Sequence, residues 1–217
     1  KTAAFTDGRR IVAGWVPSRN GNTDSGGELF GGCVVLREAL QLDNGDLATR
    51  LPEEVMPETD SPLSLTLTPT DGATVSSPGS ISVDARGDIC GAHATGVPYN
   101  CVVTLDVIPE GNYEEFGMFL RSEDKGINSY KLSFNSDNRT VRLHDSSISA
   151  VTGLDKPMKL TIVMKGDIID VCVDNRRCIV NRLPEKKGSQ LWFFARNGKL
   201  RFENIKVCPI TGDASKR

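Results

Sequence analysis

From residue 63 onward the chain is a succession of short segments in which apolar and polar residues alternate. Turn residues separate these segments roughly every ten residues, a spacing typical of an antiparallel β-sandwich. Alternation places successive side chains on opposite faces of an extended strand, so each segment has one apolar face. We therefore predict an all-β protein. The expected strands are residues 63–68, 81–85, 101–107, 116–122, 130–135, 140–144, 158–164, 168–173, 190–195 and 200–207.

The first 57 residues contain two further strand-like runs, residues 9–16 and 33–42. The second run ends at Asp43-Asn44-Gly45-Asp46, a sequence that favours a tight hairpin turn. Residues 58–62 are polar and end in proline, which is typical of a boundary between two units. We therefore divide the chain into a strand segment at residues 1–57, a linker at 58–62 and a sandwich domain at 63–217, with a surface loop at 69–80.

Composition narrows the classes of partner. The chain has 217 residues, of which 38% are hydrophobic and 25% charged, with a net charge of −2. A nucleic acid or an anionic membrane surface is not an expected partner, because no basic patch would attract it. No apolar run is long enough to cross a bilayer. Residues 1–6 have no apolar centre, so they are not a signal peptide, and a secreted parent would carry its signal further upstream.

The six cysteines form no Cys-x-x-Cys pair, and the two histidines, His93 and His144, are far apart in sequence. This pattern does not fit a zinc site, and we expect no metal or other cofactor. Cys172 and Cys178 flank a turn at residues 174–176. If that turn has three residues, the two thiols face each other across a hairpin, at a separation that a disulfide can bridge. The alternative is a pair of buried free thiols.

Several motifs of the first 57 residues follow one another in the same order as in a known protein family. They are Gly8-Arg9-Arg10-Ile11-Val12-Ala13-Gly14-Trp15-Val16, Phe30-Gly31-Gly32, Leu36-Arg37-Glu38, Asp43-Asn44-Gly45-Asp46-Leu47 and Arg50-Leu51-Pro52-Glu53-Glu54-Val55-Met56-Pro57. Together they resemble the last blade of the five-bladed propeller in glycoside hydrolase family 32, the invertases, levanases and inulinases. The resemblance is looser over residues 100–210, whose strand order looks like that of a concanavalin A-like sandwich, or jelly roll.

Catalysis in that family needs an Asp in an Asn-Asp-Pro motif, a Glu in a Glu-Cys motif and an Asp in an Arg-Asp-Pro motif. None of these motifs occurs in this chain. The resemblance therefore implies the non-catalytic carboxy-terminal part of an extracytoplasmic enzyme acting on fructans or sucrose, whether periplasmic, cell-surface or secreted. The implied partner is an upstream propeller domain, and a homo-oligomer remains open. No catalytic residue is expected, and whether the chain has any activity of its own stays undecided.

The alternative is a free-standing concanavalin A-like carbohydrate-binding module. Exposed, stacked aromatic side chains would favour the module, because flat rings stack on sugar C–H surfaces. A large apolar patch formed by residues 1–57 would favour the propeller. Tyr113 lies in a polar segment, residues 110–115, and is the best exposed aromatic candidate. Trp15 and Trp192 are expected to pack inside the protein instead.

Polar sugar hydroxyls would be bound by carboxylates, amides and guanidinium groups. Five such residues lie on or beside successive expected strands and can share one sheet face: Arg121, Glu123, Asp124, Asn128 and Arg142. We take these residues, with Tyr113, as the candidate carbohydrate site. The alternative is that they are ordinary solvent-facing residues of a half-exposed sheet.

Overall fold

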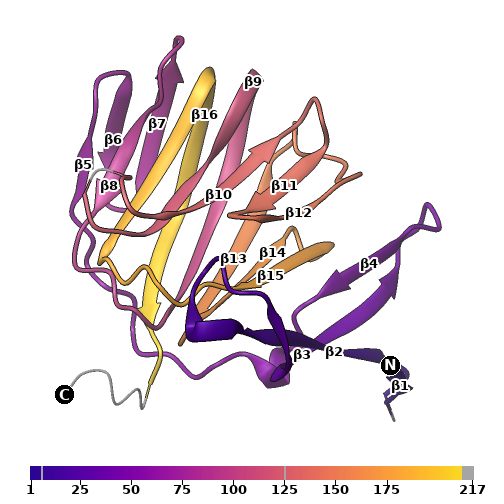
Figure 1. Ribbon diagram of the computed structural model, residues 1–217. Helices are drawn as coiled ribbons and strands as arrows, with labels where there is room; N and C mark the ends of the chain where they lie inside the picture. Colours follow the sequence, from indigo (N-terminus) through magenta and orange to yellow (C-terminus); the bar gives the residue numbers. More distant parts are fainter. Residues whose placement is uncertain (6, 125, 212–217) are drawn as a thin grey trace.

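The structure is a computed structural model that describes residues 1–5, 7–124 and 126–211. Over these residues it contains antiparallel β-strands and two single-turn 3-10 helices, η1 (Asn20–Asn22) and η2 (Glu53–Val55). The predicted all-β, antiparallel fold is confirmed. The strands form two groups, a four-stranded sheet in the order β1-β2-β3-β4 and a larger twelve-stranded network, which lie beside each other (Figure 1).

The four-stranded sheet comprises β1 (Thr2–Ala4), β2 (Arg10–Arg19), β3 (Glu28–Gln41) and β4 (Leu47–Arg50). Strand β3 starts before the expected position and includes the glycines that precede Cys33. The pairing of β2 with β3 is interrupted next to Pro17. Gly32 opposite has a φ of 138°, and a Cβ there would lie 2.0 Å from the Val16 carbonyl oxygen. Only glycine fits this irregular position, where the two backbones approach closely.

The larger network is a sandwich whose two layers share their longest strands. Strands β9 and β16 pair along most of their length and pass from one layer into the other. The start of β9 pairs with β13 and its end with β10, while the start of β16 pairs with β8 and its middle with β7. One layer therefore has the order β15-β14-β13-β9-β16-β7-β6, and the other has the order β12-β11-β10-β9-β16-β8-β5.

The bounds of the sandwich strands are β5 (Leu67–Pro69), β6 (Ala73–Ser77), β7 (Ser80–Ala85), β8 (Cys90–Ala94), β9 (Cys101–Ser122), β10 (Tyr130–Asn135), β11 (Thr140–Leu143), β12 (Ser146–Ile148), β13 (Met158–Lys165), β14 (Ile168–Val173), β15 (Arg177–Arg182) and β16 (Gln190–Pro209).

Four expectations about these strands were wrong. Residues 101–107 and 116–122 belong to one strand, β9, and residues 190–195 and 200–207 belong to β16. The polar stretch between them is no loop, because Tyr113 pairs with Gly198 where both strands cross between the layers. Residues 69–80 contain β6, and residues 63–66 precede β5. Leu63 and Leu65 nevertheless pack against the core, so the alternation marked the buried side chains correctly.

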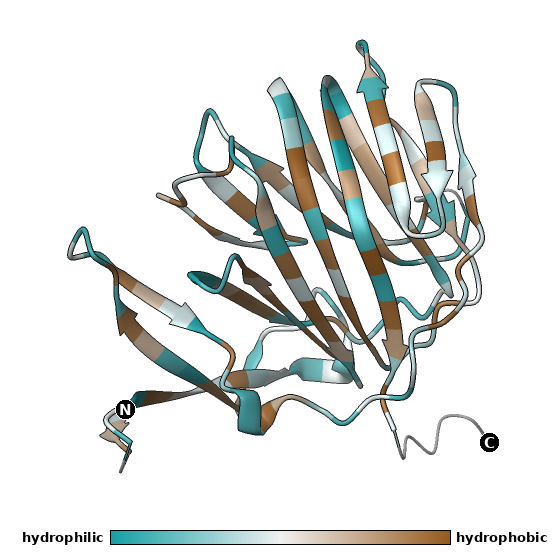
Figure 2. Ribbon diagram, turned by 180° about the vertical axis from the view of Figure 1, so that it is seen from behind, coloured by the Kyte–Doolittle hydropathy of each residue, from teal (hydrophilic) through white to brown (hydrophobic). Residues whose placement is uncertain are grey.

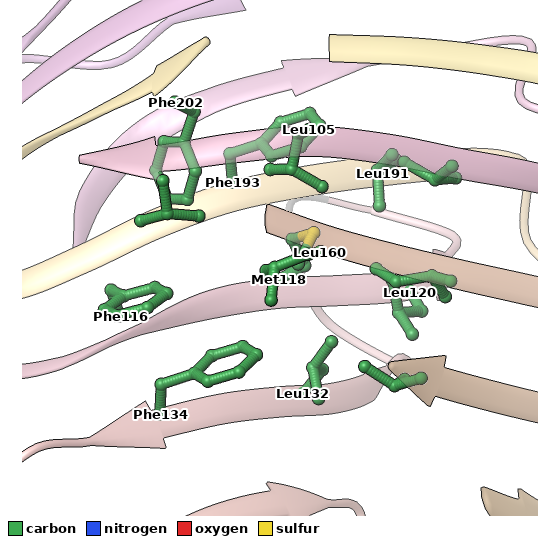
Figure 3. Close-up of a cluster of buried hydrophobic side chains, with 14 of the residues drawn as sticks. Leu105, Phe116, Met118, Leu120, Leu132, Phe134, Leu160, Leu191, Phe193 and Phe202 are labelled. Carbon is green, nitrogen blue, oxygen red and sulfur yellow. The ribbon is translucent and has the colours of Figure 1, made fainter. Parts of the chain in front are cut away.

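The core lies between the two layers. Alternation of apolar and polar residues along the strands is visible in Figure 2. Figure 3 shows the packing of the inward-facing side chains, in which the rings of Phe116 and Phe134 stack with centroids 4.7 Å apart. These side chains are fully or almost fully buried, and burial of each stabilises the fold by roughly 1.5–3 kcal/mol. The labelled members are Leu105, Phe116, Met118, Leu120, Leu132, Phe134, Leu160, Leu191, Phe193 and Phe202.

Candidate functional site

One face of the four-stranded sheet presents large apolar side chains to solvent. Trp15 on β2 pairs with Val34 on β3, so both point to the same side of the sheet. Trp15 is 54% exposed, Val34 is 72% exposed and the neighbouring Phe30 is 94% exposed. Phe30 meets Trp15 edge to face, with ring centroids 5.2 Å apart. We call Trp15, Phe30 and Val34 the outer apolar face. Trp15 was expected to be packed, yet in this chain it contacts Phe30 and remains half-exposed.

The sheet lies against the β14–β15 hairpin of the sandwich, where β2 and β4 contact β15 (Figure 1) and Arg37 of β3 reaches Asp170 of β14. A buried ion pair lies at the centre of the junction. The Arg37 guanidinium donates to the Asp170 carboxylate at 2.6 Å, and each side chain is only 12% exposed. Burial raises the pKa of Asp170, and the charge of Arg37 partly opposes that rise. The pair therefore joins the two units through a desolvated charge contact.

A second arginine extends the junction from the sandwich side. Arg182 on β15 donates through Nε to the Pro17 carbonyl oxygen at 2.8 Å, and its Nη2 lies 3.1 Å from the Cys33 sulfur. Its Nη1 pairs with Asp167. Arg182 thus contacts both β2 and β3, and its position on the sandwich is fixed by a carboxylate beside β14.

The loop between β2 and β3 is anchored to the sandwich by Asp24. One oxygen of this buried carboxylate accepts from the Tyr130 hydroxyl at 2.9 Å, and the other accepts from the Lys186 ammonium at 3.4 Å. Arg19 at the end of β2 donates to Asn181 on β15 at 3.0 Å. Polar contacts therefore fasten the loop at two separate points of the sandwich.

Strand β4 makes the last contact of the junction. The Thr49 amide donates to the Arg176 carbonyl oxygen at 2.9 Å, and Arg177 donates to the Leu47 carbonyl oxygen. The Cys178 sulfur lies 3.4 Å from the Thr49 carbonyl oxygen. The end of the four-stranded sheet thus sits on the β14–β15 hairpin.

A cavity of about 650 Å³ lies between the sheet and the sandwich. Its wall is largely apolar, and it also includes the charged residues of the Arg37–Asp170 pair, Lys165 and Asp167. The described part of the chain contains no aromatic side chain in this wall, so the cavity has no flat platform for a sugar ring.

Two of the predicted carbohydrate residues are buried and have structural partners. Tyr113 is 3% exposed, and its hydroxyl donates to the Leu154 carbonyl oxygen at 2.5 Å. Burial raises its pKa. Arg121 is 2% exposed and donates to three carbonyl oxygens, the closest that of Gly166 at 2.6 Å, while its guanidinium stacks on the Tyr99 ring. The expected exposure of Tyr113 is wrong, because residues 110–115 continue β9.

The other four candidates remain on the surface but form no joint site in the described structure. Glu123, Asp124 and Asn128 are exposed in the connection between β9 and β10. Arg142 is exposed on β11, opposite Ser133 and Ser147. Over the described residues no hydrogen bond or ion pair joins Arg142 to the other three. Their role in sugar binding stays a prediction.

The outer face of the sandwich layer that contains β8 carries aromatic pairs that are not open platforms. Trp192 stacks on His93 with centroids 4.5 Å apart, and Phe194 stacks on Phe119 at 4.6 Å. Trp192 and Phe194 are nevertheless buried, with 7% and 0% exposure. Packing of Trp192 was predicted and is confirmed.

The predicted geometry of the cysteine hairpin is confirmed. Residues 174–176 form the turn, and Cys172 on β14 pairs directly with Cys178 on β15. Both are free thiols in this structure. The described residues hold no group of His, Cys, Asp and Glu side chains suited to a metal ion, and none of their helices is long and apolar enough to cross a membrane.

Sequence reasoning missed the junction residues Arg37, Asp170, Arg182 and Asp24. They are charged residues in or beside strands, and the sequence gives no sign that they pair; Arg37 lies in the Leu36-Arg37-Glu38 motif, but that motif does not indicate a partner. The outer apolar face, in contrast, is indicated by a pattern in the sequence. Cys33-Val34-Val35-Leu36 is apolar on both strand faces, and such a run indicates a strand covered on both sides.

No family model matches the sequence, and no curated protein matches it either. Solved structures do match by fold. The carbohydrate-binding module CBM66 from Bacillus subtilis superposes with a TM-score of 0.57 at 12% identity, over 65% of this chain and 94% of that module. An exo-inulinase from Aspergillus awamori superposes with a TM-score of 0.61 at 11% identity, over 94% of this chain and 40% of the enzyme.

A glycoside hydrolase family 32 structure from Bifidobacterium adolescentis superposes with a TM-score of 0.57 at 14% identity, over 98% of this chain and 31% of that protein. This chain thus spans less than half the length of both hydrolases, and both likenesses extend across the four-stranded sheet as well as the sandwich. In fold, the chain is similar to the carboxy-terminal region of glycoside hydrolase family 32, and the resemblance found in the sequence is confirmed at that level.

Proposed function

We propose that this chain is the non-catalytic carboxy-terminal region of a family 32-like glycoside hydrolase that acts on fructans or sucrose. In this proposal residues 1–57 complete the last blade of a propeller, residues 58–62 are the linker, and residues 63–217 form the supporting sandwich. The outer apolar face is the observation that carries the proposal. A sheet with one face on the sandwich and apolar side chains on the other is suited to stacking against a further blade.

The exposed fractions of these side chains give the free energy that covering the outer apolar face would contribute. Trp15, Phe30 and Val34 together expose about two full side chains of apolar surface. Covering that surface would contribute about 3–6 kcal/mol to association.

The sandwich would then act as a rigid support for the last blade. Arg37, Asp170, Arg182 and Asp24 hold the sheet in one orientation, which buried and hydrogen-bonded ionic contacts do more selectively than apolar ones. An extracytoplasmic location and assembly with an upstream propeller belong to the same proposal.

A free-standing carbohydrate-binding module is the second candidate. The match to nearly the whole of the CBM66 module supports it. The exposed aromatic rings count against it. Trp15 and Phe30 meet at an interplanar angle of 89°, so they present no common flat surface to a sugar. Trp192, which is parallel to His93, is buried.

The size of the native protein in its source cells tests the proposal. An immunoblot with an antibody raised against this chain is expected to give a band of more than twice 23.5 kDa, the mass of these 217 residues. The purified native form should then release fructose from levan, inulin or sucrose. A band near 23.5 kDa would contradict the proposal, and titration of the chain with levan and inulin would then test the module.

A further inference from the structure

The β14–β15 hairpin carries two thiols that the proposed function does not use. Cys172 and Cys178 are directly opposed partners on neighbouring antiparallel strands. Opposed residues in such a pair have Cα atoms about 4.5–5.5 Å apart. A disulfide accepts Cα separations of about 4.4–6.8 Å, so the spacing of this pair lies within the range of a disulfide. Cys33, Cys90, Cys101 and Cys208 have no cysteine opposite them in the strand registers.

The two thiols differ in access and in acidity. Cys172 is 2% exposed, whereas Cys178 is only partly buried and points toward strand β4, with its sulfur 3.4 Å from the Thr49 carbonyl oxygen. The interaction between the two neighbouring thiols lowers the pKa of Cys172 and raises that of Cys178. Access therefore makes Cys178 the thiol that a small reagent reaches first, and the lower pKa of Cys172 suits that thiol to the second attack, which closes the disulfide.

We propose that Cys172 and Cys178 are a reversible disulfide site beneath β4, oxidised by exchange with a low-molecular-weight disulfide such as oxidised glutathione. The Cys178 thiol, which is the accessible one, loses its proton to solvent, and the resulting thiolate attacks one sulfur of the reagent, forms a mixed disulfide and releases one glutathione thiolate. The Cys172 thiolate then attacks the Cys178 sulfur and releases the second glutathione. Two protein thiols are oxidised to one disulfide, one glutathione disulfide is reduced to two thiols, and the two thiol protons pass to the released thiolates.

Oxidation has a defined consequence at the junction. Cys178 loses its S–H group, and with it the donor that faces the Thr49 carbonyl oxygen of β4. The backbone bond from Thr49 to Arg176 remains. The disulfide thus closes the hairpin on which the four-stranded sheet rests while it releases one contact to that sheet.

The test is a redox titration of the intact folded chain in glutathione buffers, followed by acid quenching, alkylation and non-reducing peptide mapping. We expect a peptide holding both Cys172 and Cys178 to lose the mass of two hydrogen atoms as the oxidised fraction of the buffer rises. Buried Cys101, which has Pro209 opposite it, is the internal control and should stay reduced. Full alkylation of Cys172 and Cys178 at every ratio, with the chain folded by circular dichroism, would overturn the proposal.

Two serine variants test the order of the steps. Cys172→Ser removes the resolving thiol, so peptide mapping should show glutathione accumulating slowly on Cys178. Cys178→Ser leaves only the buried thiol of the pair, and Cys172 should stay unmodified. Modification of Cys172 in the second variant, without modification of Cys178 in the first, would contradict the assignment of Cys178 as the entry point. Neither outcome depends on the presence of a propeller, so the two proposals fail separately.

Discussion

Replacement of Arg37 by methionine is expected to destabilise the folded chain by about 3–5 kcal/mol at pH 7. Arg37 and Asp170 are joined at 2.6 Å, and both side chains are almost fully withdrawn from solvent. Methionine fills most of the volume but leaves the carboxylate buried without a counter-charge. The cost therefore reflects the isolated charge of Asp170 rather than lost packing.

The pH dependence of the free energy of unfolding distinguishes the isolated Asp170 charge from lost packing. Burial already raises the pKa of Asp170 above its ordinary value of 3.8, and loss of Arg37 raises it further. Between the unfolded and folded pKa values the folded state binds a proton that the unfolded state does not, so the free energy of unfolding falls as pH rises. The deficit of Arg37→Met relative to the unmodified chain should therefore shrink as the pH is lowered from 7 toward 3.8.

Urea unfolding followed by tryptophan fluorescence measures both effects. The double variant Arg37→Met, Asp170→Asn should recover most of the stability, because no buried charge remains. Arg86→Met is the matched control, since the Arg86–Asp84 pair lies in solvent, with side-chain exposures of 83% and 48%, and should show no measurable change. The reasoning is refuted if Arg37→Met lowers the free energy of unfolding no more than the control does. It is also refuted if the loss at pH 7 is the same as the loss at a pH close to 3.8.

Three other substitutions have definite expected results. Tyr113→Phe removes the bond to Leu154 and should cost about 1–2 kcal/mol in urea unfolding; an unchanged midpoint would argue against that bond. Asp24→Ala leaves the buried Tyr130 hydroxyl proton without its acceptor, with an expected cost of about 1–3 kcal/mol by the same assay. Phe30→Ser should leave the midpoint unchanged, because Phe30 is 94% exposed, and should lower binding of the dye ANS; a large loss of stability would contradict its exposure.

Much of the sandwich could be predicted from alternation alone. Strands such as β10, β13 and β14 have one apolar face and clear turns at both ends, so their limits were close to correct. Long β9 and β16 could not be predicted as single strands, because polar residues interrupt the alternation where they cross between layers. Strand β8 consists mainly of small residues, and it is recognisable as a strand only from its pairing with β5 and β16.

The junction could not be predicted, because it depends on residues far apart in the sequence. Arg37 and Asp170 are separated by 133 positions, and neither is recognisable as a partner until the sheet lies on the hairpin. Arg121 shows that a residue can also be assigned to a site from the sequence and then prove to be buried. It is one of the predicted carbohydrate residues, but it is 2% exposed and donates to carbonyl oxygens of three loops that meet only in the folded chain.

The most direct test of the central claim is the solvent accessibility of the outer apolar face in the native protein. Hydroxyl-radical labelling with mass spectrometry would compare native protein from its source cells with the isolated 217-residue chain. Phe30 and Trp15 should be labelled in the isolated chain and protected in the native protein, while Ile127, which is 69% exposed on the sandwich, should react equally in both. Equal labelling of Phe30 and Trp15 in both samples would contradict the claim that another blade covers this face.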